Sequence, residues 1–127
     1  MGNKLLPGCR LGELEAAITL LLDKLDDEVL SHPQKTLKQH LLGVYQGCSA
    51  LSKRYQLPLP EETICLMALL HDIYKADARF QRYIRKEGEG VPHALPSAWF
   101  AFLMGIEKGM DTFEALLAGE AIRRHHT

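Results

Sequence analysis

The sequence contains few cysteines, no long apolar run and almost no excess of either charge. Its three cysteines, Cys9, Cys48 and Cys65, are odd in number and form no Cys-x-x-Cys pair. They predict neither a disulfide framework nor a structural zinc site, and buried free thiols are the simpler interpretation. Two glutamates interrupt the apolar stretch at 11–22, and no uncharged run reaches the roughly 18 residues of a membrane span. We therefore expect a cytoplasmic protein without a signal peptide and without a membrane partner.

The balance of charges limits how this protein could hold a nucleic acid. It has 15 basic and 16 acidic side chains and a formal charge of −1, so no global positive field attracts a polyanion. A polyanionic substrate would have to be held locally, by metal ions. The length of 127 residues and the hydrophobic content of 46% predict one domain with its own core, covering residues 1–127.

Apolar residues recur at steps of three and four along most of the chain, which is typical of amphipathic helices. No stretch alternates like a strand, and no internal repeat is present. The segment at 95–108 is apolar nearly all round, which predicts a central, well-covered helix. Asp77 and Asp111 are typical N-caps, and Gly109 is a typical helix stop. The fold class is therefore all-α, with about six helices at 11–29, 34–55, 60–72, a short segment after Asp77, 95–108 and 111–126.

The dipeptide His71-Asp72 follows the apolar run at 64–70, so a buried helix delivers two metal-binding side chains together. A short carboxylate can bridge two cations, and imidazole favours zinc, iron, nickel or copper. Taken alone, the dipeptide is weak evidence for a metal site, and a hydrogen-bonded core histidine beside an exposed aspartate is the preferred interpretation. Burying the pair without partners would be costly.

Other histidines lie beside apolar positions of separate elements. His40 borders the apolar stripe of the second predicted helix, His93 stands at the entry to the most apolar helix, and His125 and His126 end the last one. Each has an ordinary alternative role as a core, capping or tail residue. Together they come from four elements, and helical bundles build metal sites from such inward projections. His32, before Pro33, has no comparable setting and is interpreted as a surface residue.

The residues also suggest a family. His40, then HDIYKADARFQRYI from His71, then HALPSA from His93, then the pair His125-His126 form a pattern over most of the chain from about residue 37. This pattern resembles the HD nuclease domain of the CRISPR-associated helicase-nuclease of type I interference systems, including its stand-alone form. The combination is far more specific than the HD dipeptide alone.

The resemblance implies an HD-domain helical bundle that binds one or two divalent transition metal ions, such as Mn, Ni, Fe, Co or Zn. It implies hydrolysis of phosphodiester bonds in single-stranded DNA during CRISPR interference, with a helicase and the RNA-guided surveillance complex as partners. Asp72 would bridge the ions and act in catalysis with Lys75, and Ser97 would support the site, although a surface role is equally open for Lys75 and Ser97. The implied metal ligands are His40, His71, Asp72, His93, His125 and His126.

Other residues have weaker roles in this comparison. Phe80 and Gln81 are interpreted as packing and positioning residues. A positive channel for a single strand could use basic side chains near the site, although solvated helix faces are the preferred interpretation for Arg85 and Lys86. The candidates are Arg79, Arg82, Arg85, Lys86, Arg123 and Arg124.

Three departures keep alternatives open. Tyr74 and Thr127 stand where the family usually has glycine, and the further aspartate ligand that the family supplies beyond the paired histidines is missing. The domain is therefore expected to be truncated at its C-terminus, or to complete its metal sphere with water or a partner. The alternative functions are an HD phosphohydrolase that acts on nucleotides and a catalytically incomplete helical module that docks onto a partner.

Overall fold

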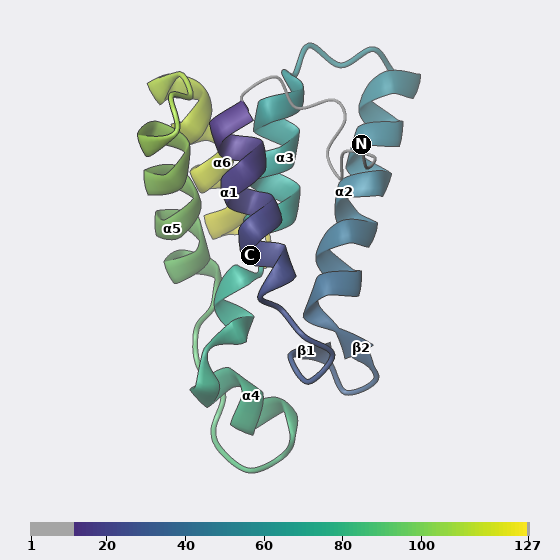
Figure 1. The fold of residues 1–127 in the computed structure, drawn as a ribbon, viewed down its shortest axis with the longest axis vertical. Coiled ribbons are helices and arrows are strands. Elements are labelled where there is room, and N and C mark those ends of the chain that lie inside the picture. Colours follow the sequence, from purple (N-terminus) through teal and green to yellow (C-terminus); the bar gives the residue numbers. More distant parts are fainter. Residues whose placement is uncertain (1–11, 127) are drawn as a thin grey trace.

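Helices account for most of the computed structural model, which describes residues 12–126 (Figure 1). Its elements are α1 (Gly12–Asp23), β1 (Leu30–His32), β2 (Lys35–Thr36), α2 (Leu37–Arg54), α3 (Glu61–Leu70), the 3-10 helix η1 (Ile73–Ala76), α4 (Ala78–Ile84), α5 (Ala94–Glu107) and α6 (Thr112–Arg124). The predicted all-α class with six helices is confirmed. None of the described helices is long and apolar enough to cross a membrane.

Local capping explains where several helices begin and end. Thr36 and Gln39 form a reciprocal capping box at the start of α2, which satisfies two backbone N–H groups. Asp77 caps α4, and Asp111 accepts a hydrogen bond from the Glu114 backbone N–H at the start of α6. Gly109 adopts φ +90 just after α5, a conformation that glycine tolerates best. The caps and the stop that the sequence predicts are therefore correct.

The core is built around α3, which packs against α2, α5 and α6 (Figure 1). Seven of its ten residues are buried, from Thr63 to Leu66 and from Ala68 to Leu70. The helix α1 adds Leu14, Ile18 and Leu22, all fully buried, to the same core. Because α3 is covered on all sides, its C-terminal end lies inside the protein, and the chain leaves the helix there at His71 and Asp72.

The prediction of a central position for the helix at 95–108 is wrong. In α5 the buried positions are the small residues Ser97, Ala98, Ala101 and Gly105, whereas the Trp99 side chain is 58% exposed. Small residues let α5 and α6 approach closely, since a Cβ added at Gly119 of α6 would lie 3.4 Å from the Ala98 carbonyl oxygen. Leu95, Trp99, Leu103 and Ile106 consequently point outward, whereas Phe100, Phe102 and Met104 pack partly against the core.

Element boundaries near the N-terminus also differ from the prediction. The helix expected over 11–29 ends at Asp23, and Leu11 lies outside the described residues. The Asp26 carboxylate accepts a hydrogen bond from the Glu28 backbone N–H, which stabilises a turn before β1. The strands β1 and β2 then form a small antiparallel hairpin, so the expectation of no strands is wrong within the described residues. This hairpin precedes α2 directly and lies at the α4 end of the bundle (Figure 1).

Candidate metal centre

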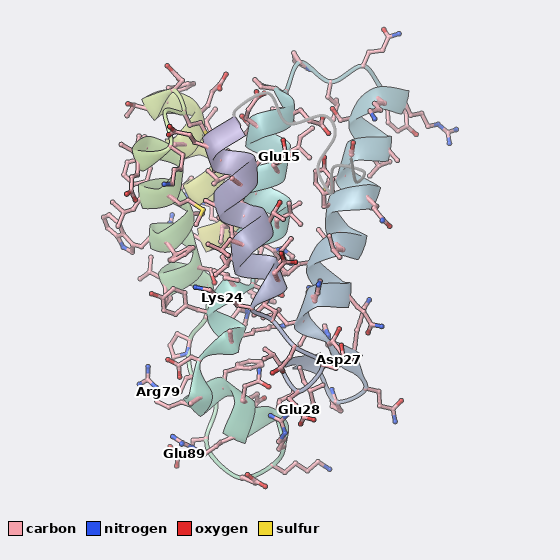
Figure 2. All side chains as sticks on the ribbon, in the orientation of Figure 1. Glu15, Lys24, Asp27, Glu28, Arg79 and Glu89 are labelled. Carbon is pink, nitrogen blue, oxygen red and sulfur yellow. The ribbon has the colours of Figure 1, made fainter. Side chains whose placement is uncertain are left out.

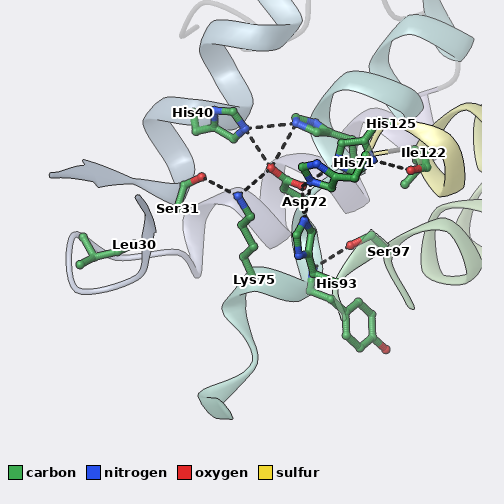
Figure 3. A network of polar contacts seen from close by, with 12 residues as sticks. Leu30, Ser31, His40, His71, Asp72, Lys75, His93, Ser97, Ile122 and His125 are labelled. Carbon is green, nitrogen blue, oxygen red and sulfur yellow. Dashed lines mark hydrogen bonds and ion pairs between the residues drawn. The ribbon is translucent and has the colours of Figure 1, made fainter. Parts of the chain in front are cut away.

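Asp72 lies at the centre of a cluster of histidines, just beyond the end of α3 (Figure 3). It is only 2% exposed and ranks among the largest fully buried side chains of the protein. Helix α3 ends at Leu70, His71 caps it, and Asp72 has left helical geometry with φ −121 and ψ 19. The break in the helix brings both residues of the dipeptide to the same site.

The two carboxylate oxygens of Asp72 face two separate groups of histidines. Oδ2 lies 3.0 Å from Nε2 of His40 and 3.4 Å from Nε2 of His71. Oδ1 lies 3.2 Å from Nε2 of His93, 3.0 Å from Nε2 of His125 and 4.0 Å from Nε2 of His126. Within each group, one ligand atom from every residue lies within 4.8 Å of the others. Asp72 belongs to both groups, which is the arrangement of a bridging carboxylate.

Four separate elements deliver the histidines, as the sequence predicts. His40 comes from α2, His71 from the end of α3, and His93 from the N-cap of α5. His125 is the C-cap of α6, and His126 follows it. The structure therefore brings together all six residues that the sequence assigns as metal ligands. Their Nε2 atoms are also close to one another, at 3.2 Å for His40 and His71 and 2.8 Å for His93 and His126.

Backbone hydrogen bonds fix the orientation of two of the rings. Nδ1 of His71 donates to the Ala68 carbonyl at 2.7 Å, and Nδ1 of His125 donates to the Ile122 carbonyl. A neutral imidazole that donates from Nδ1 carries a lone pair on Nε2, and metal-binding histidines are typically oriented in this way. The Nε2 lone pairs of both rings therefore converge with the Asp72 oxygens, so acceptors meet acceptors at this centre. A cation between them satisfies the whole set, and the donor chemistry fits a divalent metal.

Burial and charge act on the titratable groups of the centre in opposite directions. Burial alone would raise the pKa of the Asp72 carboxyl, but a hydrogen bond from His93 and the charges of His71 and Lys75 hold that pKa well below its usual value. Burial lowers the pKa of His40, His71 and His126, although the Asp72 carboxylate opposes this effect. Both directions favour neutral rings of His40, His71 and His126 around an ionised Asp72, which are the protonation states that bind metals.

Lys75 is a buried member of this centre. It is 6% exposed, and its Nζ lies 3.2 Å from Oδ2 of Asp72 and 3.5 Å from Oγ of Ser31. Of the two roles left open by the sequence, a solvated surface role is excluded by this burial. Ser31 was not anticipated, because its place in the site depends on the β1 hairpin. Gln81 fixes that hairpin, since its side-chain amide donates to the carbonyls of Leu30 and Lys75 and accepts from the Leu30 N–H.

Ser97 supports the site from one step away. It is fully buried, and its hydroxyl accepts a hydrogen bond from the Tyr74 backbone N–H at 3.0 Å. This bond ties α5 to η1, which follows Asp72 directly. Phe80 is 4% exposed and packs edge-on against the His93 ring, with 5.6 Å between ring centroids. The interpretations of Phe80 and Gln81 as packing and positioning residues agree with these contacts.

The remaining predicted residues lie around the centre rather than in it. His32 is exposed, as predicted, although its ring lies against that of His40 with 5.2 Å between centroids. Arg79 pairs with Asp77 and its side chain is 68% exposed at the α4 end of the molecule (Figure 2). Arg85 donates to the Glu28 and Gln81 carbonyls. No described contact joins Arg79 or Arg85 to the histidine cluster.

Comparison with known proteins gives one match. A family profile described as HD domain matches residues 37–127, a range that contains every residue of the cluster except Ser31. No curated protein and no solved structure matches the chain.

Proposed function

The chain belongs to the HD-domain family, whose members are generally metal-dependent hydrolases, and we propose that it hydrolyses phosphodiester bonds in single-stranded DNA. The substrate, and a role in CRISPR interference with a separate helicase and an RNA-guided surveillance complex, rest on the resemblance of the motif pattern. The metal chemistry rests on the centre itself. The single observation that carries it is the division of the Asp72 oxygens between two groups of imidazoles.

The ligand set indicates which ions the site would hold. His93, His125 and His126 with Oδ1 of Asp72 would hold one ion. His40 and His71 with Oδ2 would hold a second. A site with five imidazoles and one carboxylate suits Mn, Fe, Co, Ni or Zn better than Mg or Ca, which prefer oxygen ligands. When bound, such ions polarise a phosphoryl oxygen and lower the pKa of bound water.

The other residues of the centre act on the ligands. Lys75 lies against Oδ2 of Asp72, so its charge helps to keep the carboxylate ionised and fixed in orientation. In this proposal Lys75 is a positioning residue that acts through Asp72, and direct contact with the scissile phosphate stays a prediction. Ser31 and Gln81 hold the lysine and its segment in place. The His126 side chain, 53% exposed, marks the side from which a substrate can reach the ligands.

The first test measures metal binding on untagged protein. Metal content after purification and thermal unfolding with added Mn²⁺ or Ni²⁺ should both report binding. A ligand that binds only the folded state stabilises it by about 2.7 kcal/mol at a concentration of 100 Kd. Asp72→Asn should abolish most of this shift because it removes the charge shared by both groups. Asp23→Asn, at an exposed aspartate at the end of α1, is the matched control and should retain it.

The second test measures chemistry. Labelled single-stranded DNA, duplex DNA and free nucleotides are each incubated with the protein and Mn²⁺ or Ni²⁺. Single-stranded DNA should be cleaved, and Asp72→Asn and His71→Ala should each lose more than the roughly 10- to 100-fold typical of a residue that only supports a ligand. Hydrolysis of nucleotides without cleavage of DNA would replace the proposed substrate with the nucleotide alternative. Equal cleavage by the parent and both variants would refute the assignment of the site.

A further inference from the structure

A groove between α5 and α6 begins at the metal centre and runs along the surface away from it. Its first part, a cavity of about 510 Å³, is lined by Pro92 and by the ligands His93 and His126. Its second part, of about 340 Å³, includes Trp99. Leu95 and Arg123 line both parts, so the two cavities are neighbours on the surface.

The walls of the second part are apolar and aromatic, and its floor is made of small residues. Trp99 and Phe102 of α5 lie edge to face, with 6.3 Å between their ring centroids. Ala98 and Gly119 form the floor, and a Cβ at Gly119 would lie 3.5 Å from that of Phe102. Trp99 follows His93 by six residues, so at about 1.5 Å per residue it lies roughly 9 Å along the helix axis from this ligand. The two residues line neighbouring cavities that share Leu95 and Arg123.

We infer that this groove binds a base of a single-stranded nucleic acid beside the scissile phosphate, with Trp99 as the stacking surface. The inference rests on the proposed function and adds to it the part of the protein that holds the strand. A flat aromatic side chain stacks on any base, which suits a nuclease without sequence preference. His93 and His126 line the neighbouring cavity, so a strand stacked on Trp99 would have the metal centre beside it.

Charge at the junction of the two cavities fits a phosphodiester backbone. Arg123 lines both parts, and its guanidinium is oriented by an ion pair with Glu120, which Arg124 also contacts at 3.1 Å. Of these three side chains, Arg123 lines both cavities, Glu120 lines the apolar part, and Arg124 lines neither. The pair holds Arg123 between the stacking surface and the metal ligands, where the backbone of a bound strand would pass. Glu120 lines the apolar part, where its carboxylate can accept a hydrogen bond from a base amino group.

The openness of the groove favours a strand over a free nucleotide. Pockets for small molecules bury about 70–90% or more of their ligand. Here Trp99 is 58% exposed and Leu95 is 51% exposed, so a base stacked on them keeps one side in solvent. A polymer that continues past the groove at both ends tolerates this exposure, because its affinity is spread over several nucleotides.

Intrinsic fluorescence tests the inference directly, because Trp99 is the only tryptophan of the chain. Short oligothymidylate is titrated into the parent protein in EDTA, so that binding is measured without hydrolysis. Stacking should quench Trp99, and thymidine monophosphate should quench it far more weakly. An unchanged spectrum at oligonucleotide concentrations that saturate binding would overturn the inference. So would sedimentation showing a stable dimer whose formation hides Trp99 from a soluble quencher.

Variants separate this groove from the metal centre. Trp99→Ala should weaken binding of labelled oligothymidylate about five- to 150-fold, the range for losing one stacked base, whereas Trp99→Phe should retain most of it. Phe113→Ala removes an aromatic side chain that is 66% exposed outside the groove and should have no effect. Arg123→Gln should reduce the salt dependence of binding by about one phosphate contact.

The two proposals can fail independently. If DNA quenches Trp99 but no metal supports cleavage, the nuclease function fails and the strand-binding groove stands. If metal-dependent cleavage occurs but Trp99→Ala binds and cleaves like the parent, the groove is wrong and the nuclease function stands.

Discussion

Removing the Asp72 carboxylate should destabilise the protein strongly even without metal, because it leaves Lys75 as a buried cation. Lys75 is 6% exposed, and its charged contact within the centre is Oδ2 of Asp72 at 3.2 Å. The Ser31 hydroxyl at 3.5 Å is too distant to replace a carboxylate. Breaking a buried ion pair by deleting one partner typically costs about 3–5 kcal/mol. We therefore expect Asp72→Ala to lose about 3–5 kcal/mol of unfolding free energy, a large part of the 5–15 kcal/mol typical of a domain.

Two further variants test whether the unpaired cation causes the loss. Lys75→Met in the Asp72→Ala background replaces the ammonium with an apolar side chain of similar length, so it should recover at least about 1 kcal/mol. Glu120→Ala is the matched control, because its carboxylate pairs with two arginines but is 45% exposed. Loss of such surface pairs costs only about 0–1 kcal/mol.

Urea unfolding followed by circular dichroism, with EDTA present throughout, measures all four proteins under the same conditions. The reasoning is refuted if Asp72→Ala loses no more stability than Glu120→Ala. It is also refuted if adding Lys75→Met lowers stability further, because Lys75 would then contribute through its packing rather than depend on its counter-ion.

Three further predictions concern residues outside the ligand set. Ser97→Ala removes the buried hydroxyl that accepts the Tyr74 N–H, so urea unfolding should show a loss of about 1–3 kcal/mol; a loss below about 0.3 kcal/mol would mean that water takes its place. Gly105→Ala should lower the unfolding free energy by about 1–3 kcal/mol, because its Cβ would meet three side chains at 3.0–3.2 Å. Gly47→Ala in α2, where a Cβ would meet nothing within 4 Å, should instead raise it by about 0.5–1 kcal/mol. Changes of the same sign in the two variants would contradict this packing. Burial raises the pKa of the Cys48 thiol, so at a pH near 8.5 iodoacetamide should label this thiol more slowly than it labels a free cysteine peptide. Mass spectrometry measures both labelling rates, and equal rates would indicate an accessible thiolate.

The sequence predicts much of this fold because its signals are local. Capping residues such as Asp77 and Asp111 act within one helical turn, so their effect does not depend on the rest of the protein. The hairpin of β1 and β2 was missed because strands of two and three residues are too short to show alternation. The predicted central position of α5 was wrong for a different reason. An apolar helix can be central or can carry an exposed apolar face, and only its neighbours, here α6 against Ala98, decide between the two.

For the candidate site, the sequence identifies which residues meet but not how far each is buried. The histidines lie beside apolar stripes, so their inward direction follows from helical periodicity. The burial of Lys75 does not follow from composition, because lysine is rarely buried unless it is paired. The sequence spacing nevertheless contains a signal that could have predicted the burial of Lys75. Asp72 and Lys75 are three residues apart, close enough to pair on one helical turn, and the structure joins them at 3.2 Å.

The most informative difference between prediction and structure is the end of α3. In a continuous helix, consecutive side chains point about 100° apart, so His71 and Asp72 could not both face one centre. The periodicity predicts a helix to about residue 72, yet α3 ends at Leu70 and Asp72 is already outside helical geometry. The His71 ring is held against the Ala68 carbonyl of the last turn, while the Tyr74 N–H bonds to Ser97 on the other side of the break. The helix therefore stops where the site requires two adjacent residues to point the same way, and this stop depends on contacts from α5 that local sequence does not contain.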